Sequence, residues 1–216
     1  MKVVAYVPMK LNNERLPGKN TKRFDSGKPL FNYILESLLK VSQIDEVYVY
    51  CSSPEIVEDI PDGIKYLSRD KLLDRSETKI NEVMLSFAKD VDADIYVLAH
   101  ATAPFISHTS IAKAVSDVCS GDYDSALSVV KLQEFLWKNK EPFNYDPSSI
   151  PRTQDLDPLY AETTGLYVYT KDVFLNKNRR IGLKPSLVEV SKIEAIDINE
   201  SIDFVIANAV YKNLFK

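Results

Sequence analysis

The chain has 216 residues, of which 45% are hydrophobic and 27% charged, a composition typical of soluble globular proteins. This excludes disordered, collagen-like and membrane-embedded classes, since no apolar run is long enough to span a bilayer. The N-terminus has no signal-peptide pattern, so we expect a cytoplasmic protein without a membrane partner. The net charge of −4 argues against nucleic-acid binding. Cys51 and Cys119 lack disulfide-framework or metal-site spacing and are predicted to be small buried hydrophobic residues.

Strand-like apolar runs alternate with helical periods in the first 120 residues. The predicted strands are 3–8, 46–51 and 95–99, and the predicted helices are 30–41, 80–91 and 111–119. Repeated strand, loop and helix units imply a doubly wound, mainly parallel α/β sheet. Ligands of such sheets bind beyond the carboxyl ends of the strands.

The pattern changes at about residues 131–163, which hold several aromatic residues and four prolines. Helical periodicity does not persist through so many prolines. We interpret this stretch as an excursion from the sheet, within a single α/β domain of residues 1–216. It is a dimerisation arm, a lid or an irregular loop.

After this excursion the chain is predicted to return to the sheet. Two apolar runs, 165–169 and 194–198, are interpreted as strands. A closing helix is predicted over 203–214, with one apolar side formed by Val205, Ile206, Ala209 and Leu214.

The segment that follows the first strand, residues 10–29, is strongly basic although the chain is acidic. We call it the first loop. Its Lys10, Arg15 and Lys19 are suited to the charge of a triphosphate, and a solvated charged loop is the alternative. The Gly-Lys pair is followed by Asn20 rather than Ser or Thr, so this is not a Walker A loop, and it is not a GxGxxG motif either. A P-loop kinase and a dinucleotide dehydrogenase are therefore disfavoured.

Seven short features occur along the chain in a fixed order. They are Pro8 with Lys10, ERLPGKN at 14–20, GKPL at 27–30, Arg69, HATAP at 100–104, IDIN at 196–199, and Asp203. This ordered set resembles the acylneuraminate cytidylyltransferases, the CMP-sialic acid synthetases and their relatives. The resemblance covers nearly the whole chain.

The resemblance implies a nucleotidyltransferase that moves CMP from CTP to the anomeric hydroxyl of a nonulosonic sugar acid and releases pyrophosphate. CTP and a sugar acid are the implied ligands, Mg²⁺ the cofactor and a homodimer the assembly. The implied nucleotide-binding residues are Pro8, Met9, Lys10, Arg15, Lys19, Asn20, Arg69 and Thr78. Catalysis is assigned to Lys10, Lys19 and Asp197, and the metal to Asp197 with Asn199.

The resemblance also implies where the acceptor binds. His100 and Thr102 follow a strand end, and Glu162 precedes a predicted strand. Arg152 and Gln154 match the R-x-Q stretch of the family's dimerisation arm, which reaches into the neighbouring subunit's site. All five are therefore expected to bind the sugar acid.

Simpler interpretations remain open from the residues alone. An aspartate in the position of Asp197 often caps a turn, and His100 is alternatively a satisfied core residue. Arg152 is alternatively part of a loop ion pair. A basic segment near the C-terminal end is interpreted as a solvated loop and comprises Lys177, Arg179, Arg180 and Lys184.

Three residues depart from the family pattern. Lys10 stands where an arginine is usual, which keeps the charge but loses the bidentate fork. Glu14 stands where a lysine is common, and Asn199 replaces the second aspartate of the metal pair, although an amide oxygen can still hold Mg²⁺. Two alternatives stay open: a nucleotidyltransferase for another acceptor, such as a Kdo-like sugar, and a weakly active nucleotide-binding homologue.

Overall fold

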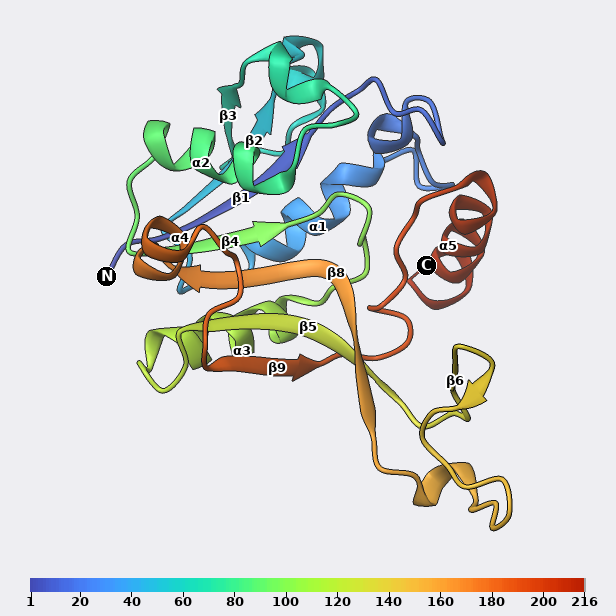
Figure 1. Ribbon diagram of the computed structural model, residues 1–216. Helices are drawn as coiled ribbons and strands as arrows, with labels where there is room; N and C mark the ends of the chain where they lie inside the picture. Colours follow the sequence, from blue (N-terminus) through green and yellow to red (C-terminus); the bar gives the residue numbers. More distant parts are fainter. Residues whose placement is uncertain (216) are drawn as a thin grey trace.

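Seven strands form a central sheet between two layers of helices (Figure 1). The computed structural model describes residues 1–215. The strand order is β3-β2-β1-β4-β8-β5-β9, and neighbours are parallel except where β8 pairs with β4 and β5. This confirms the predicted mainly parallel α/β fold. The strands are β1 (Val3–Met9), β2 (Glu46–Cys51), β3 (Lys65–Ser68), β4 (Ile95–Ala99), β5 (Ser125–Leu132), β8 (Leu159–Thr170) and β9 (Pro185–Glu189).

Helices cover both faces of the sheet because successive strand residues point to opposite sides. On β1, Val3, Ala5 and Val7 pack towards α1 and α3, whereas Val4 and Tyr6 pack towards α2 and α4. The two faces thus form separate hydrophobic clusters. The helices are α1 (Leu30–Leu39), α2 (Ile80–Asp90), α3 (His108–Cys119), α4 (Lys171–Lys177) and α5 (Ser201–Leu214). No helix in the described chain is long and apolar enough to cross a membrane.

The prediction of a strand at 194–198 is wrong. The chain forms a turn there and then continues without strand pairing. The Glu194 carboxylate accepts hydrogen bonds from the hydroxyls of Ser107 and Ser110, both at 2.7 Å, and of Ser191 at 2.9 Å. These bonds tie the segment to the start of α3 rather than to a sheet edge. Strands β3, β5 and β9 were not predicted.

Helix α5 does not bury the side expected from its periodicity. Its aromatic residues turn inwards instead: Phe204 and Tyr211 pack against Phe24 of the first loop, with ring centroids 5.2 and 5.7 Å apart. Contact with this third, smaller cluster sets the rotation of the helix. The four residues predicted to form its apolar side are all exposed: Val205, Ile206, Ala209 and Leu214.

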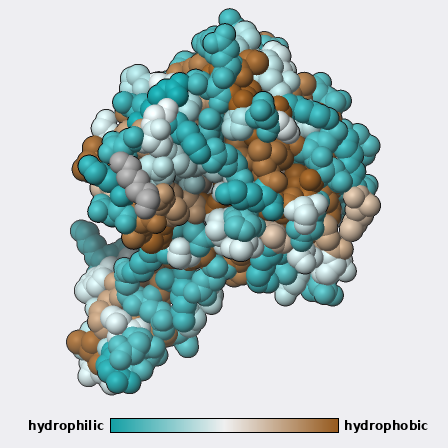
Figure 2. Space-filling view, turned by 180° about the vertical axis from the view of Figure 1, so that it is seen from behind, coloured by the Kyte–Doolittle hydropathy of each residue, from teal (hydrophilic) through white to brown (hydrophobic). Residues whose placement is uncertain are grey.

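Residues 133–158 leave the sheet between β5 and β8 and stand clear of the main body (Figures 1 and 2). We call this segment the arm. It contains a two-stranded ladder of β6 (Trp137–Lys138) and β7 (Glu141–Pro142) and a short 3₁₀ helix, Thr153–Asp155. The outer half of β8 extends from the sheet towards it, after a bulge in the β5–β8 pairing between Leu127 and Val129.

The inner half of β8 passes close to the turn after β4, and Gly165 makes this possible. A Cβ atom added at Gly165 would lie 2.4 Å from Ile106 Cδ1 and 2.6 Å from Ala103 Cβ. Gly165→Ala is therefore expected to lower the free energy of unfolding by about 1–3 kcal/mol through overpacking. Urea denaturation of the native protein and the variant measures this difference. An unchanged midpoint for Gly165→Ala would contradict the close approach.

Candidate active site

The first loop meets residues 196–199, which we call the IDIN segment, beside the carboxyl ends of the parallel strands (Figure 1). Lys19 Nζ donates to the carbonyl oxygen of Ile198 at 2.9 Å. The Arg15 guanidinium donates to Asn199 Oδ1, also at 2.9 Å. Two segments about 180 residues apart in sequence are thus held together by the basic side chains of the first loop.

Local backbone geometry places these groups. Gly18 has φ +64°, a left-handed conformation that suits glycine, and the chain then enters the 3₁₀ helix Lys19–Thr21. On the other side, Asp203 accepts from the backbone N–H groups of Asn199 and Glu200, which begins α5 directly after the IDIN segment. Asp203 is therefore a helix cap in this structure.

The turn after β4 joins the same place. The N–H of Ile198 donates to the carbonyl oxygen of Thr102 at 2.8 Å. The N–H of His100 donates to Gly165 O at 3.0 Å and so continues the β4–β8 ladder one residue past the strand. The structure therefore brings His100, Thr102 and the IDIN segment together.

Asp197 has one carboxylate oxygen engaged and one free. Its Oδ2 accepts from Asn199 Nδ2 at 2.7 Å. Its Oδ1 is buried and has no hydrogen-bond partner among residues 1–215. A buried carboxylate oxygen without a donor is unfavourable unless a cation or ligand completes it. The pKa of the neighbouring Lys19 is lowered by burial, while the charge of Asp197 acts to raise it.

Two adjoining hollows lie along the first loop. One, of about 340 Å³, is lined by the first loop and Ser76; the other, of about 210 Å³, lies over the ends of β1 and β4, and Lys10 borders both. Seven of the eight predicted nucleotide-binding residues line one or both hollows: Pro8, Met9, Lys10, Arg15, Lys19, Arg69 and Thr78. The eighth, Asn20, donates to the carbonyl of Lys10 at 3.0 Å.

Arg69 is held by Asp74, a residue that the sequence did not single out. Their ion pair spans 2.7 Å, and only 4% of the Arg69 side chain is exposed. The carbonyl oxygen of Asp74 also accepts from Lys10 Nζ at 3.0 Å and from Asn12 at 3.2 Å. Asp74 thus links Arg69 to the first loop, and direct contact of Arg69 with nucleotide stays a prediction.

His100 borders the smaller hollow and has a buried ring nitrogen. Its Nε2 has no partner in the part of the chain that the structure describes. Burial lowers the pKa of His100 to about 4; Arg180 and Lys19 act in the same direction and Asp197 against them. The imidazole is therefore neutral at pH 7.

This pKa predicts how stability depends on pH. Between pH 6.5 and about 4 the unfolded chain binds a proton at His100 that the folded chain does not, so acid destabilises the fold. The free energy of unfolding is expected to fall by about 1–2 kcal/mol more in the native protein than in His100→Gln between roughly pH 7 and 5. Urea denaturation of both proteins at the two pH values measures the difference, and an equal fall would contradict it.

Tyr167 of β8 connects two further side chains. Its hydroxyl donates to Glu162 at 2.7 Å and accepts from the Arg180 guanidinium at 3.0 Å. The guanidinium carbon lies 3.7 Å from the centre of the tyrosine ring. The interpretation of Arg180 as a solvated loop residue is therefore wrong, since the side chain is half-buried against the sheet.

The remaining acceptor residues predicted from the sequence lie in the arm. Arg152 is exposed and forms an ion pair with Asp155, with 2.7 Å between Nε and Oδ2. The carbonyl of Gln154 accepts from Gln133 at 3.1 Å. Neither residue lines the two hollows of its own chain.

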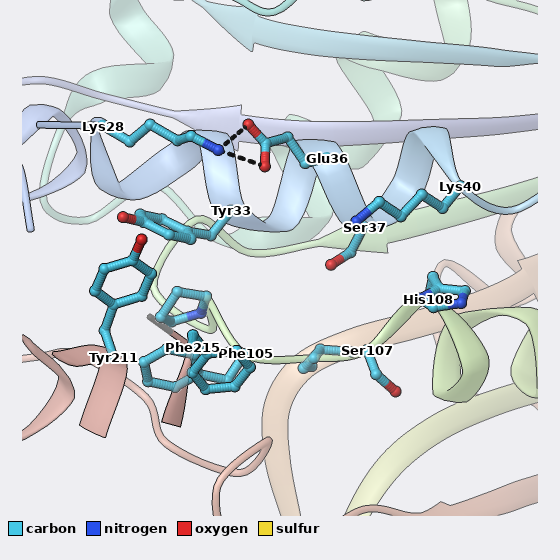
Figure 3. Close-up of a pocket in the computed structure, with 12 residues that line it drawn as sticks. Lys28, Tyr33, Glu36, Ser37, Lys40, Phe105, Ser107, His108, Tyr211 and Phe215 are labelled. Carbon is cyan, nitrogen blue, oxygen red and sulfur yellow. Dashed lines mark hydrogen bonds and ion pairs between the residues drawn. The ribbon is translucent and has the colours of Figure 1, made fainter. Parts of the chain in front are cut away.

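A third hollow, of about 370 Å³, lies between α1, the segment before α3 and the end of α5 (Figure 3). Lys28 on its rim is neutralised by Glu36, at 2.6 and 2.8 Å, and Phe105, Tyr211 and Phe215 form an aromatic wall. Since no residue of 1–215 with a buried, unpartnered polar atom lines it, we place the site at the first loop.

Comparison with known proteins identifies the family. A family model described as Cytidylyltransferase matches residues 4–204. The chain belongs to the cytidylyltransferase family. The matched range contains the first loop, the turn after β4 and the IDIN segment, which are the parts that converge in the structure.

The relatives of this cytidylyltransferase act on sugar acids, as their names state. It is 23% identical over 215 residues to N-acylneuraminate cytidylyltransferase A of Danio rerio, covering 95% of this chain and 50% of that protein. It is 27% identical over 221 residues to the CMP-N,N'-diacetyllegionaminic acid synthase of Legionella pneumophila, covering 95% and 94%. The chain thus spans about half the length of some relatives and nearly all of another.

Solved structures show the same fold. A CMP:2-keto-3-deoxy-manno-octonic acid synthetase complexed with CTP matches this cytidylyltransferase with a TM-score of 0.76 at 17% identity, covering 98% of this chain and 99% of that chain. A 4-diphosphocytidyl-2C-methyl-D-erythritol synthase from Anaerococcus prevotii matches with a TM-score of 0.68 at 13% identity, covering 98% and 96%.

Proposed function

We propose that this cytidylyltransferase transfers CMP from CTP to the anomeric hydroxyl of a nonulosonic sugar acid in the cytoplasm and releases pyrophosphate. The carrying observation is the unpartnered, buried Oδ1 of Asp197 beside the buried ammonium of Lys19. An anionic group and a cationic group at the mouth of an α/β sheet suit a phosphate ligand that arrives with a cation. The names of the relatives support CTP and a sugar acid as substrates.

The chain's own residues supply the charge that the reaction needs. Attack on the α-phosphate of CTP builds negative charge on phosphate oxygens and on the leaving pyrophosphate. Arg15 and Lys19 line the larger hollow, where their positive charges would stabilise these oxygens. Lys10 borders both hollows and would bind the phosphate that lies between the cytidine and the acceptor sugar acid. The smaller hollow, with Arg69 and Thr78, would take the cytosine end, and His100, which also borders it, stays a predicted contact of the acceptor.

Asp197 fits Mg²⁺ as a single carboxylate ligand. The ion usually keeps several waters and binds through one or two carboxylates together with substrate phosphates. The described residues contain no group of three or more His, Cys, Asp or Glu that could hold a metal alone, which agrees with a site completed by substrate. Mg²⁺ at Asp197 would neutralise phosphate charge. The Oδ1 of Asn199 accepts a hydrogen bond from Arg15 in this structure, so its role as a metal ligand stays a prediction.

Pyrophosphate release tests this function. The full chain is incubated with Mg²⁺, each of the four NTPs, and N-acetylneuraminic acid, N,N'-diacetyllegionaminic acid or 3-deoxy-manno-octulosonic acid. We expect release with CTP and one acid. Release with 3-deoxy-manno-octulosonic acid alone would favour the Kdo-like alternative, for which the fold match is the specific support. Silence throughout, with CTP still raising the melting temperature, would favour a weakly active binding homologue.

We also propose that the arm forms a homodimer and carries Arg152 and Gln154 into the partner's site. The arm exposes large apolar residues, with 61% of Trp137 and 65% of Ile150 accessible. Such residues away from a core favour a protein interface. Light scattering at micromolar concentration should give twice the chain mass, and Trp137→Asp with Ile150→Asp should give a monomer. Leu183→Asp, at a residue that is 75% exposed outside the arm, should stay dimeric. A monomeric native protein would contradict the proposal.

A further inference from the structure

Arg180 has the features of an anion-binding side chain rather than of a structural ion pair. No carboxylate lies within ion-pair distance of it among residues 1–215. Its one side-chain hydrogen bond in this part of the chain goes to the Tyr167 hydroxyl. A guanidinium carries five N–H donors, so most of its donors stay available. A half-buried cation without a counter-ion is unfavourable, and an anionic ligand would relieve this cost.

Tyr167 fixes the orientation of this guanidinium. The Arg180 guanidinium carbon lies 3.7 Å from the centre of the Tyr167 ring, so the ring covers one side of it. Tyr167 is 1% exposed as a residue, and its hydroxyl bonds to both Arg180 and Glu162. The ordered planar fork that results matches a carboxylate through two parallel hydrogen bonds.

The sheet places this group next to the candidate active site. Tyr167 pairs with Leu98 on β4, and His100 lies two residues beyond Leu98, on the same face of the sheet. His100 borders the smaller hollow. The charges of Arg180 and Asp197 both act on His100, which agrees with their closeness. Arg180 is thus near His100 and Asp197, on the face of the sheet to which β8 contributes Tyr167.

We propose that Arg180 binds the carboxylate of the acceptor, and that Tyr167 and Glu162 hold it in position. This proposal rests on the proposed function, because it assumes that the acceptor is a sugar acid and assigns the recognition of its carboxylate to a residue of the same chain. The family resemblance implies a contact between the sugar acid and Arg152 of a partner subunit. Arg180 provides its contact from within the same chain.

The test compares a sugar acid with its carboxamide in steady-state kinetics. The acid is the best substrate of the three named above, and the proteins are the full chain, Arg180→Gln, Arg180→Lys, Arg152→Gln and Lys177→Gln. Lys177 is exposed at the end of α4, so Lys177→Gln removes the same charge away from Tyr167. Melting temperatures establish that each variant is folded, and Arg180→Lys retains a charge where Arg180→Gln does not.

Arg180→Gln is expected to raise KM for the acid about 10- to 100-fold, with KM for CTP changed less than about twofold. The native preference for acid over carboxamide should fall by the same factor, and Arg180→Lys should be intermediate. Lys177→Gln should match the native protein. Loss of the preference in Arg152→Gln but not in Arg180→Gln would overturn the inference and leave the proposed function standing.

If the native protein shows no turnover, the proposed function is contradicted. The role of Arg180 is then tested separately by measuring the binding of the sugar acid. Calorimetric titration of N-acetylneuraminic acid in the presence of CTP should show binding to the native chain and to Lys177→Gln, and about 10-fold or weaker binding to Arg180→Gln. Equal affinity for all three proteins, or no binding to any, would overturn the role of Arg180.

Discussion

Asp197→Asn is expected to slow CTP-dependent pyrophosphate release by about 10²- to 10³-fold or more, the range seen when one preorganised charged contact is removed. The substitution keeps the side-chain shape and removes the charge of the carboxylate whose Oδ1 is buried without a partner. Folding should be preserved, since the residue is replaced by its own amide. Initial rates over a range of Mg²⁺ concentrations measure the effect, and the variant should also need more Mg²⁺.

The control is Glu189→Gln, which removes one carboxylate from an exposed residue at the end of β9. It should match the native protein in rate and in Mg²⁺ dependence. Native rates in Asp197→Asn would show that Asp197 only orders the IDIN segment through Asn199. A slow Asp197→Asn variant with unchanged Mg²⁺ dependence would indicate that Asp197 acts through its charge on Lys19 rather than as a metal ligand.

Lys19→Met, as a single variant, is expected to reduce the rate of CTP-dependent pyrophosphate release by about 10²-fold or more. Methionine fills a similar volume, but it removes the ammonium that lines the larger hollow and donates to Ile198 O at 2.9 Å. Lys22→Met, three residues further on, removes a charge that lies over the ring of Phe204, at 5.3 Å from its centre. This control should retain its activity, and equal losses in the two variants would point to overall charge rather than to Lys19.

Lys19 also predicts a signature at alkaline pH. Burial lowers its pKa, so the ammonium loses its proton at a lower pH than an ordinary lysine does. If the charged form binds phosphate, activity should decline on the alkaline side earlier than expected for a free lysine. Lys19→Arg stays charged and should move that decline to higher pH. A pH profile unaffected by Lys19→Arg would assign the decline to another group.

Much of the site was predictable because it depends on chain order and residue type. Lys10, Arg15 and Lys19 follow the first predicted strand directly, and the topology of a parallel sheet puts that loop at the carboxyl edge. The IDIN segment was assigned to the same place by resemblance. The structure joins the two through Lys19 and Arg15.

Other functional candidates carry no local signal. Asp74 lies in a short 3₁₀ helix among charged residues, and only the fold turns its carboxylate to Arg69 and its carbonyl to Lys10. Arg180 follows another arginine in a basic segment, a pattern typical of a solvated loop. Its role depends on Tyr167, and a contact between residues on different elements is set by packing, not by spacing along the chain.

Periodicity, composition and the order of motifs were enough to predict the mainly parallel α/β class, the basic first loop and the family resemblance. Packing was needed to decide which side of α5 is buried, that the chain turns within 194–198, and that Arg180 lies on Tyr167 without a carboxylate partner in residues 1–215. Apolar periodicity shows that a face exists. Competition between contacts, here aromatic packing on Phe24 and serine bonds to Glu194, decides what that face meets.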